Sequence, residues 1–370
     1  MLQNELLYQV ALTCLNKVGD IHSKNLIAYC GSAKSVFETS KTNLTNIPGI
    51  GEIIADSILD NKTALKEAEK EIRFIEDNSI RPLFFTDVDF PRRLKFCNDG
   101  PVLLYYKGNA NLNTEKIVAV VGTRTPSGYG LETTEKFISE LSGSGILVVS
   151  GLAYGVDVLA HRCALNHNLD TVGVVGHGLD RIYPQGHENI AYRMTRQGGL
   201  LTDFKSGTNP DAQNFPKRNR IVAGMCDALV VIESKREGGS LITATIANSY
   251  NKDVFAFPGR TNDPFSEGCN GFIKSNRAVL MESAADLFYV MNWNAVHETK
   301  KKDKQIPLPI HLSADEEKIV KAFSQKKQMH MDEISYVSNF PISKVASLLL
   351  QLEFTNIIKS LPGKMYTLIN

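Results

Sequence analysis

The sequence has almost no excess of charge of either sign, since 41 lysines and arginines stand against 40 acidic residues and leave a formal net charge of +1. A uniformly basic surface, as on many nucleic-acid-binding proteins, is therefore excluded, and any anion site must depend on local clustering of cations. Cysteine is also scarce. The six cysteines lie far apart and form no C-x-x-C pair, so the sequence predicts reduced thiols without a zinc site or a disulfide framework.

Long apolar runs are absent as well. No segment approaches the roughly 18 apolar residues that a membrane-spanning helix needs, and the first residues, Met-Leu-Gln-Asn-Glu, do not resemble a signal peptide. We therefore expect a cytoplasmic protein with no membrane partner. With 370 residues and 43% hydrophobic content, the chain is long and apolar enough for two or three domains with sizeable cores.

Six apolar, β-branched runs do stand out, and each ends in glycine or a small polar residue, with a cation or hydroxyl close behind. They are 117–122, 146–151, 172–177, 200–203, 228–233 and 254–259. Continuous apolar runs separated by helix-length segments predict an α/β fold with a doubly wound parallel sheet. Because right-handed crossovers return each strand to the same edge, we expect all six polar ends to meet in one crevice. Its content of Arg, Lys, Gly and Ser favours a phosphate or polyanion binder over a hydrolase.

The composition divides the chain into four parts. Residues 1–78 have helical apolar spacing, 79–295 hold the α/β domain, 296–312 form a charged linker with prolines, and 313–370 form a compact end unit. Residues 44–56 resemble a helix-hairpin-helix motif, whose Gly-x-Gly turn can hold one DNA phosphate. Glu52 beside that turn carries the wrong charge, so both DNA contact and simple packing stay open. For the linker, a solvated tether is favoured over a DNA-binding arm.

The end unit has the element order of a winged helix. Ser313 and Glu316 predict a capping box that opens a first helix, two further helices follow, and residues 357–368 read as a hairpin. The helix in the recognition position, 343–351, offers one lysine and no arginine, which is poor equipment for reading a major groove. Contact with protein is at least as well supported as contact with DNA.

The loop after the first run carries the first candidate site. A dinucleotide fingerprint requires glycine where Arg124 and Ser127 stand, so that interpretation fails. An arginine at a strand end beside a serine at a helix start suits a phosphate instead, with Gly122 and Thr123 in the same loop. A structural alternative, in which Arg124 pairs with Asp203 across the crevice, stays open.

The densest cluster of cations follows at 214–220. Charge for phosphates, amides for base edges and a ring for stacking are the components of single-stranded DNA recognition, and they come from Phe215, Lys217, Arg218, Asn219 and Arg220. In the alternative, this is a solvated basic turn with the Phe215 ring in the core. The remaining predicted DNA-binding residues are an anion nest and three further cations: Gly239, Ser240, Lys235, Arg260 and Lys274.

Some of these positions also suggest enzymatic alternatives. The nest resembles the Pro-Gly-Gly-x-Gly-Thr loop of nucleotide phosphoribohydrolases, but Leu241 replaces the third glycine, and Ala244 and Thr245 stand where the catalytic glutamate belongs. Asp157 and His161, one helical turn apart, could suggest a metal, although a helix-dipole role for Asp157 explains the pair better. His177 could act as an acid or base, but no positioned nucleophile accompanies it, which favours a lining residue. We therefore expect no catalytic residue, no metal and no cofactor.

Seven motifs, in this order along the chain, together resemble the DprA/Smf family of DNA-processing proteins. They begin at Val121, Ser150, Gly178, Phe215, Gly239, Pro258 and Gly268. The resemblance implies an extended Rossmann-like domain that binds single-stranded DNA without reading sequence, self-associates as a homodimer and loads the RecA recombinase. It also implies a helix-hairpin-helix (SAM-like) front and a winged-helix end.

Three positions depart from the family pattern. Tyr154 stands where arginine is usual, and Thr123 replaces a serine but keeps the hydroxyl. The segment after Lys274 differs too, and there Arg277 could restore the cation that Tyr154 removes.

Overall fold

The computed structural model describes residues 2–293 and 312–369, apart from 324, 325, 327, 356 and 362. The chain divides into two compact units, residues 1–295 and 296–370. Of the predicted linker 296–312, residues 296–311 lie outside the described residues. The predicted boundary at residue 78 falls inside the first unit, so the helical front and the α/β part pack as one body.

The front of the chain is helical, as predicted. Its helices are α1 (Leu2–Cys14), α2 (Asp20–Cys30), α3 (Ala33–Glu38), α4 (Lys41–Thr45), α5 (Glu52–Leu59) and α6 (Lys62–Asp77). Between α4 and α5 the chain turns at Gly49, whose φ of +84° favours glycine, and Gly51 is the N-cap of α5. Lys41 of α4, just before the motif 44–56, forms an ion pair with Asp56 of α5, so this neighbouring cation already has an acidic partner.

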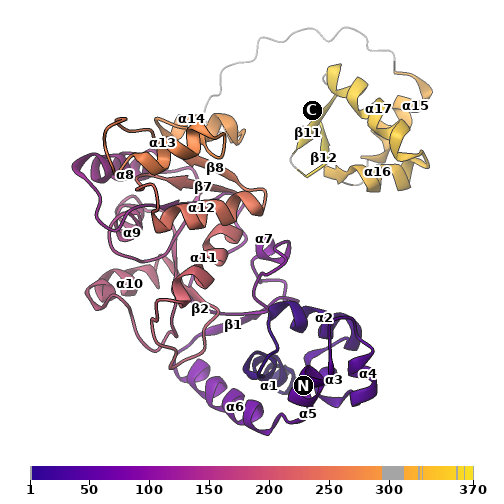
Figure 1. Ribbon diagram of the computed structural model, residues 1–370. Helices are drawn as coiled ribbons and strands as arrows, with labels where there is room; N and C mark the ends of the chain where they lie inside the picture. The colour runs from indigo at the N-terminus through magenta and orange to yellow at the C-terminus, as the bar shows by residue number, and fades with distance from the viewer. Residues whose placement is uncertain are drawn as a thin grey trace. The chain divides into compact units, whose positions relative to one another are not determined.

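A nine-stranded sheet forms the centre of the first unit (Figure 1). The strands are β1 (Arg81–Phe84), β2 (Leu103–Gly108), β3 (Ile117–Val121), β4 (Leu147–Ser150), β5 (Thr171–Val174), β6 (Gly198–Thr202), β7 (Ala228–Val231), β8 (Asp253–Ala256) and β9 (Val279–Leu280). Their order is β1-β2-β6-β5-β4-β3-β7-β8-β9. The strands from β3 to β9 are parallel, while β1 and β2 add an antiparallel edge. The prediction of a doubly wound parallel sheet is confirmed.

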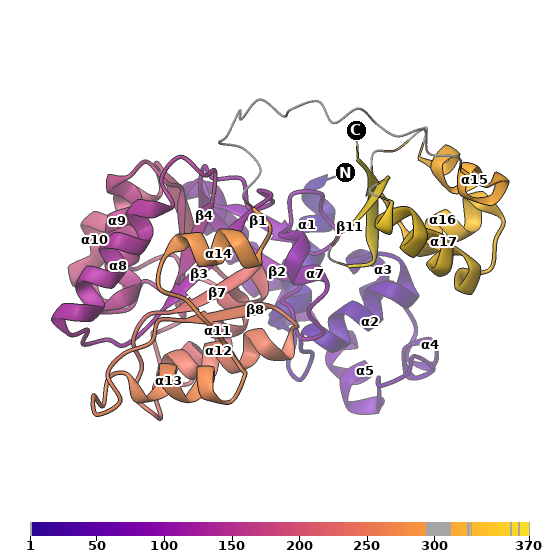
Figure 2. The ribbon, with the colours of Figure 1, turned by 90° about the horizontal axis from the view of Figure 1, so that it is seen from above.

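Helices cover both faces of the sheet, which explains why its strands are apolar throughout (Figure 2). On one face lie α8 (Gly128–Glu140), α9 (Val156–Asn166) and α14 (Ala284–Val290), packed on Val118, Val120 and Val230. On the other lie α11 (Asn214–Met225), α12 (Gly239–Ser249) and α13 (Glu267–Lys274), packed on the alternate residues Ala119, Val121 and Val231. A smaller cluster under α10 (Glu188–Met194) extends the layer beside β6.

The helical front shares a core with the antiparallel edge of the sheet. Leu12 of α1 and Ala68 of α6 belong to the same buried cluster as Phe84, Leu103 and Tyr105 of β1 and β2. Beside this core, the buried carboxylate of Glu71 accepts hydrogen bonds from the backbone N–H and the hydroxyl of Ser206, in the loop that precedes α11. The front therefore supports the segment that enters α11.

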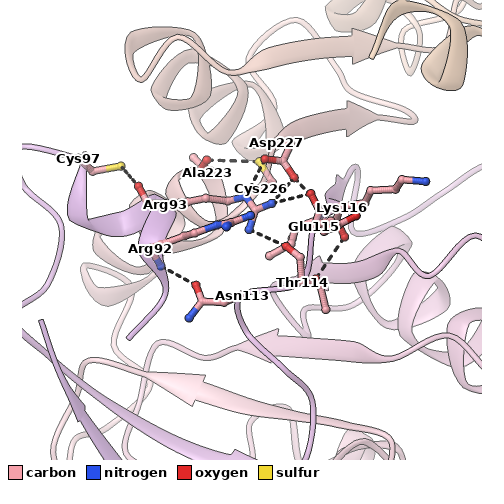
Figure 3. Close-up of polar contacts among 11 residues, drawn as sticks. Arg92, Arg93, Cys97, Asn113, Thr114, Glu115, Lys116, Ala223, Cys226 and Asp227 are labelled. Atoms are coloured by element: carbon pink, nitrogen blue, oxygen red, sulfur yellow. Dashed lines mark hydrogen bonds and ion pairs between the residues drawn. The ribbon is translucent and has the colours of Figure 1, made fainter. Parts of the chain in front are cut away.

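At the amino ends of β3 and β7, an ion pair between the buried Arg93 and the partly exposed Asp227 ties the short helix α7 (Arg92–Lys95) to the sheet (Figure 3). The Arg93 guanidinium donates to both carboxylate oxygens of Asp227, at 2.6 and 2.7 Å, and also to the carbonyls of Thr114 and Glu115. Asp227 accepts the backbone N–H of Ile117 in addition. This network joins the amino ends of β3 and β7.

The second unit is a winged helix, as predicted. It contains α15 (Ala314–Ala322), β10 (Gln328–His330), α16 (Met331–Ser338), α17 (Ile342–Phe354), β11 (Ile358–Leu361) and β12 (Met365–Leu368), with strand order β10-β12-β11. The capping box of Ser313 and Glu316 is present. Lys344, the lysine of the predicted recognition helix, lies 2.7 Å from the Asp315 carboxylate. That pairing neutralises the cation which a major groove would need.

Candidate nucleic-acid interface

A groove of about 790 Å³ opens at the carboxyl ends of β3, β4 and β7. It lies where the chain order of the sheet reverses, because β3 leads to β4 on one side while β7 leads to β8 on the other. Ligands of doubly wound folds bind at such a switch point. We call this hollow the groove.

The groove brings together nine of the predicted site residues: Gly122, Thr123, Arg124, Phe215, Arg218, Asn219, Lys235, Gly239 and Ser240. They come from the loop after β3, from one face of α11 and from the loop that opens α12. Five predicted residues are not among its lining residues: Ser127, Lys217, Arg220, Arg260 and Lys274.

The expectation that all six strand ends meet in one crevice is wrong. The ends of β6 and β8 are separated by β5, β4, β3 and β7, which is five strand spacings of about 4.8 Å, or about 24 Å. Arg260, after β8, borders a separate hollow, and Lys274 lies exposed at the last turn of α13. A sheet this wide cannot bring both outer ends into one site.

Ser127 does not face the groove as predicted, because an acid already occupies the start of α8. The Glu233 carboxylate, almost fully buried, accepts the Ser127 hydroxyl at 2.5 Å and the Ser127 backbone N–H at 2.9 Å. The Ser127 hydroxyl in turn accepts the Gly130 N–H at 3.2 Å. A carboxylate is stabilised at a helix amino end for the same reason as a phosphate. The position that binds the cofactor phosphates in dinucleotide folds is therefore filled by the protein itself.

Arg124 extends from the loop after β3 into the groove and is exposed. Among the described residues, no carboxylate lies within ion-pair distance of it. The alternative partner, Asp203, instead lies 2.7 Å from Arg220, so the pairing across the crevice is not formed. The Arg124 guanidinium lies 5.8 Å from the centre of the Phe215 ring, which leaves its donors available to a ligand.

The dense cluster 214–220 is the first part of α11, not a turn before it. Besides Pro216, the residues of α11 that line the groove are Phe215, Arg218, Asn219 and Val222, which follow the helical spacing of one face. Lys217 falls outside that face. Arg220 also points away from it, toward Asp203 and toward Asp20 of α2, at 2.7 and 3.0 Å. The helical spacing of this segment could have distinguished Arg218 from Lys217 and Arg220 by sequence alone.

Arg218 is buried beneath the groove, with 5% of its surface exposed. Its guanidinium lies against Gly151, where an added Cβ would be 1.8 Å from Nη1, so only glycine leaves it room. Within the described part of the chain, its Nε has no hydrogen-bond partner. Burial lowers the pKa of Arg218 and raises that of nearby Asp157, and each charge partly offsets the other's shift. A cation whose buried Nε is an unused donor therefore lies under the groove.

The amino end of α12 also opens into the groove. Gly238 is the N-cap, and an added Cβ on exposed Gly239 would meet no heavy atom within 4 Å. The Ser240 hydroxyl lies 2.8 Å from that of Ser234. The Leu241 N–H donates to the Gly238 carbonyl, while the N–H groups of Gly239 and Ser240 have no acceptor among the described residues. Lys235 is exposed beside it, with its ammonium 5.0 Å from the Phe265 ring. This helix end can accept an anion.

Phe215 is half-buried and lies outside the hydrophobic core clusters of the described residues. Its ring lies 6.1 Å from that of Tyr183, tilted by 35°. The packing therefore does not support the alternative in which the Phe215 ring is part of the hydrophobic core.

The histidines considered as acids, bases or ligands have structural partners. His161 Nδ1 lies 2.6 Å from the Thr171 hydroxyl, in a fully buried site. His177 accepts the Tyr183 backbone N–H at Nε2 and bonds the Gly178 carbonyl through Nδ1. In the part of the chain that the structure describes, no three His, Cys, Asp or Glu side chains come together as a metal site would need.

The departures from the family pattern have clear places. Tyr154 is 54% exposed and adjoins the groove. Arg277 does not replace a cation in the groove, because it lies 4.1 Å from the Phe272 ring and donates to the Thr245 hydroxyl.

Comparison with known proteins decides the family. The sequence profile described as DNA recombination-mediator protein A matches residues 81–292, and that of the DprA winged helix domain matches 303–364. The chain belongs to the DprA/Smf family. Protein Smf of Synechocystis is 30% identical over 400 residues, covering 99% of both chains. DNA processing protein DprA of Streptococcus pneumoniae is 40% identical over 198 residues, covering 54% of this chain and 70% of its own.

Two solved DprA structures agree with the fold. That from S. pneumoniae has a TM-score of 0.64 at 30% identity and covers 76% of this chain and 97% of its own. The Helicobacter pylori protein, studied for its single-stranded DNA binding mode, has a TM-score of 0.53 at 28% identity and covers 58% of this chain and 95% of its own. No described helix of the present chain is both long and apolar enough to cross a membrane.

Proposed function

We propose that this DprA/Smf protein binds single-stranded DNA in the groove without reading base sequence. The observation that carries this proposal is the combination, in one groove, of the exposed Arg124, the amino end of α12 and the half-buried Phe215 ring. The first two suit phosphates, because guanidinium and backbone N–H groups are their preferred donors. The ring suits a base face that only an unpaired strand presents.

The near-neutral net charge supports phosphate binding at a local cluster of cations rather than over a uniformly basic surface. The proposed DNA-binding residues that line the groove are Gly122, Thr123, Arg124, Phe215, Arg218, Asn219, Lys235, Gly239 and Ser240. Phosphate contacts carry no sequence information, so we expect similar affinity for strands of different composition.

We further propose that the bound strand is passed to the RecA recombinase, and that the chain acts as a homodimer with no catalytic step of its own. The family's description as a recombination mediator supports the first part. Ala244 and Thr245, where a phosphoribohydrolase would have its glutamate, support the last. Nucleotide cleavage on the same sheet is the disfavoured alternative.

A titration of one oligonucleotide, single-stranded and as a duplex, tests the proposed binding. We expect the full chain to bind the single strand much more tightly than the duplex. We also expect RecA to assemble faster on single-stranded DNA to which this protein is bound. Equal affinity for the duplex would contradict the proposal. Release of free base from nucleoside monophosphates would favour the enzymatic alternative.

A further inference from the structure

Polar contacts join the helical front to the segment 203–213, which runs from the end of β6 to the start of α11. Helix α6 contacts this segment twice, through an ion pair with Lys205 and through the hydrogen bonds to Ser206 described above. Further along the same segment, Pro210 and Ala212 line the groove. One wall of the groove therefore rests on the front of the chain.

A third contact is made by Arg220, which lies on α11 and points away from the groove. Its Nη2 donates to the Asp203 carboxylate at 2.7 Å and to the Asp20 carboxylate of α2 at 3.0 Å. The side chains of Arg220, Asp203 and Asp20 are largely buried, with 16, 12 and 28% of their surfaces exposed. Through its other oxygen, Asp20 accepts the backbone N–H of Val102 at 2.9 Å. We call the three side chains the Arg220 bridge, because they join the front to the end of β6.

The Arg220 bridge is better suited to fixing a geometry than to adding stability. Two carboxylates and one guanidinium are largely taken out of water, and Asp203 Oδ1 is buried with no hydrogen-bond partner among the described residues. Buried charges of this kind contribute little net stability compared with apolar side chains of the same volume. Their hydrogen bonds are directional, however, and hold the groups that they join at one distance and angle. The bridge therefore restrains where α11 lies relative to α2 and β6.

This restraint acts on the side of α11 that lies behind the groove. Successive residues of an α-helix are about 100° apart around its axis. Arg220 follows Arg218 by two residues, so the two side chains leave α11 about 200° apart, in nearly opposite directions. A helix that is anchored on its rear face cannot turn about its axis. Its front face, with Phe215, Arg218 and Asn219, is then kept toward the groove.

Resting on the proposed binding of single-stranded DNA, we propose that Arg220 is a positioning residue for the strand, which orients the groove face of α11 through Asp20 of the helical front and Asp203. Arg220 itself touches no nucleotide. The front of the chain then contributes to affinity, although none of its described residues lines the groove.

Asp20→Asn tests this role in the full chain, because it keeps an oxygen for the Val102 N–H and removes the charge that Arg220 faces. Positioning predicts weaker binding to oligo-dT by roughly 2- to 150-fold, the range of coupling within one network of contacts. A purely electrostatic effect predicts the opposite sign, since the loss of an acid favours a polyanion. Asp99→Asn is the matched control and should not weaken binding, because Asp99 borders the same hollow as Asp20 and Arg220 but bonds to Tyr250.

Arg220→Gln separates positioning from direct contact with the strand. It should weaken binding as Asp20→Asn does, while the slope of log affinity against log salt concentration stays unchanged. A direct phosphate contact would instead flatten that slope by about 0.7. The double variant should lose no more affinity than Arg220→Gln alone, because both changes break the same bridge. Arg220→Lys, which keeps the cation, should restore part of the loss.

The outcomes separate this inference from the function on which it rests. Wild-type affinity of the folded Asp20→Asn and Arg220→Gln variants, or a flattened slope for Arg220→Gln, overturns the positioning role. Wild-type protein that does not bind oligo-dT overturns the proposed function itself. Should the variants fail to fold, the wild-type chain still decides. Coupling is reciprocal, so bound oligo-dT must slow hydrogen exchange of the Val102 amide, and unchanged exchange overturns the proposal.

Discussion

At the residue scale, three arginines near the groove have three different environments. Arg124 is exposed and has no acidic partner among the described residues, Arg218 is buried beside Asp157, and Arg220 is paired with Asp20 and Asp203. An arginine count would treat them alike. Because a paired cation contributes little to binding an external phosphate, we expect direct phosphate contact from Arg124 first.

Replacing Arg124→Ala should weaken single-strand binding ten- to hundredfold, because a charge-assisted hydrogen bond to phosphate contributes about 1.5–3 kcal/mol. The slope of log affinity against log salt concentration should also flatten by about 0.7 for the lost contact. Fluorescence anisotropy at several salt concentrations measures both. Arg162→Ala is a suitable control, since Arg162 is exposed and does not line the groove. An unchanged slope in a folded Arg124 variant would refute the phosphate role.

Phe215→Ala should cost about 1–3 kcal/mol of single-strand binding at a nearly constant salt slope, since the ring contributes stacking and no charge. Its melting temperature should change little, because the ring lies outside the core clusters of the described residues. Binding and melting are measured on the same preparation. A large fall in melting temperature with normal binding by the folded fraction would show that Phe215 serves packing alone.

At the element scale, the sequence predicted the elements better than their contacts. Apolar runs identified the six parallel strands from β3 to β8, and capping and turn residues identified the winged helix. The hydrophobic pattern of a sequence does not determine the order of strands in a sheet. It therefore could not show that Arg260, after β8, would lie far from β6. Nor could it show that Glu233 reaches Ser127, 106 residues away in sequence. Long-range partners depend on packing that no local spacing encodes.

The Arg93–Asp227 network, which connects α7 to the sheet, should be essential for the stability of the fold. Replacing Arg93→Met leaves the Asp227 carboxylate and two backbone carbonyls without this donor. Breaking a fully buried pair costs about 3–5 kcal/mol, and because Asp227 is partly exposed we expect a loss toward the lower end of that range. Urea unfolding measures the loss. Lys95→Met, in the same helix but at an exposed position, should cost under about 1 kcal/mol. Similar values for both variants would mean that the network contributes little.

At the scale of the whole molecule, the proposed DNA-binding residues all belong to the first of the two compact units. The groove lies wholly within residues 1–295, and the lysine of α17 in the winged helix is already paired with Asp315. A chain ending at residue 295 should therefore keep its single-strand affinity within a few-fold of the full chain. A loss as large as that of Arg124→Ala would instead assign DNA contact to the winged helix, with Lys359 and Lys364 of its hairpin as the first candidates.

The first unit should also lose stability in mild acid through one buried histidine. Burial lowers the pKa of His161 from 6.5 to about 3, so the folded protein keeps the ring neutral while the unfolded chain binds a proton below pH 6.5. The contribution is fully present above pH 6.5 and is lost as pH falls toward 3. His161→Leu should flatten this part of the stability curve, measured by urea unfolding between pH 7 and 4. Parallel curves for both proteins would contradict the assignment.

The carboxylate of Glu233 at the start of α8 has a further consequence for competition in the cell. Free nucleotides are abundant there, and the first turn of a doubly wound fold is where they would ordinarily bind. Since that turn is filled by the chain's own acid, its charge repels a nucleotide's phosphates. Free nucleotides should therefore not bind at that turn, and we expect any competition with a bound strand to arise at Arg124 and the amino end of α12 instead.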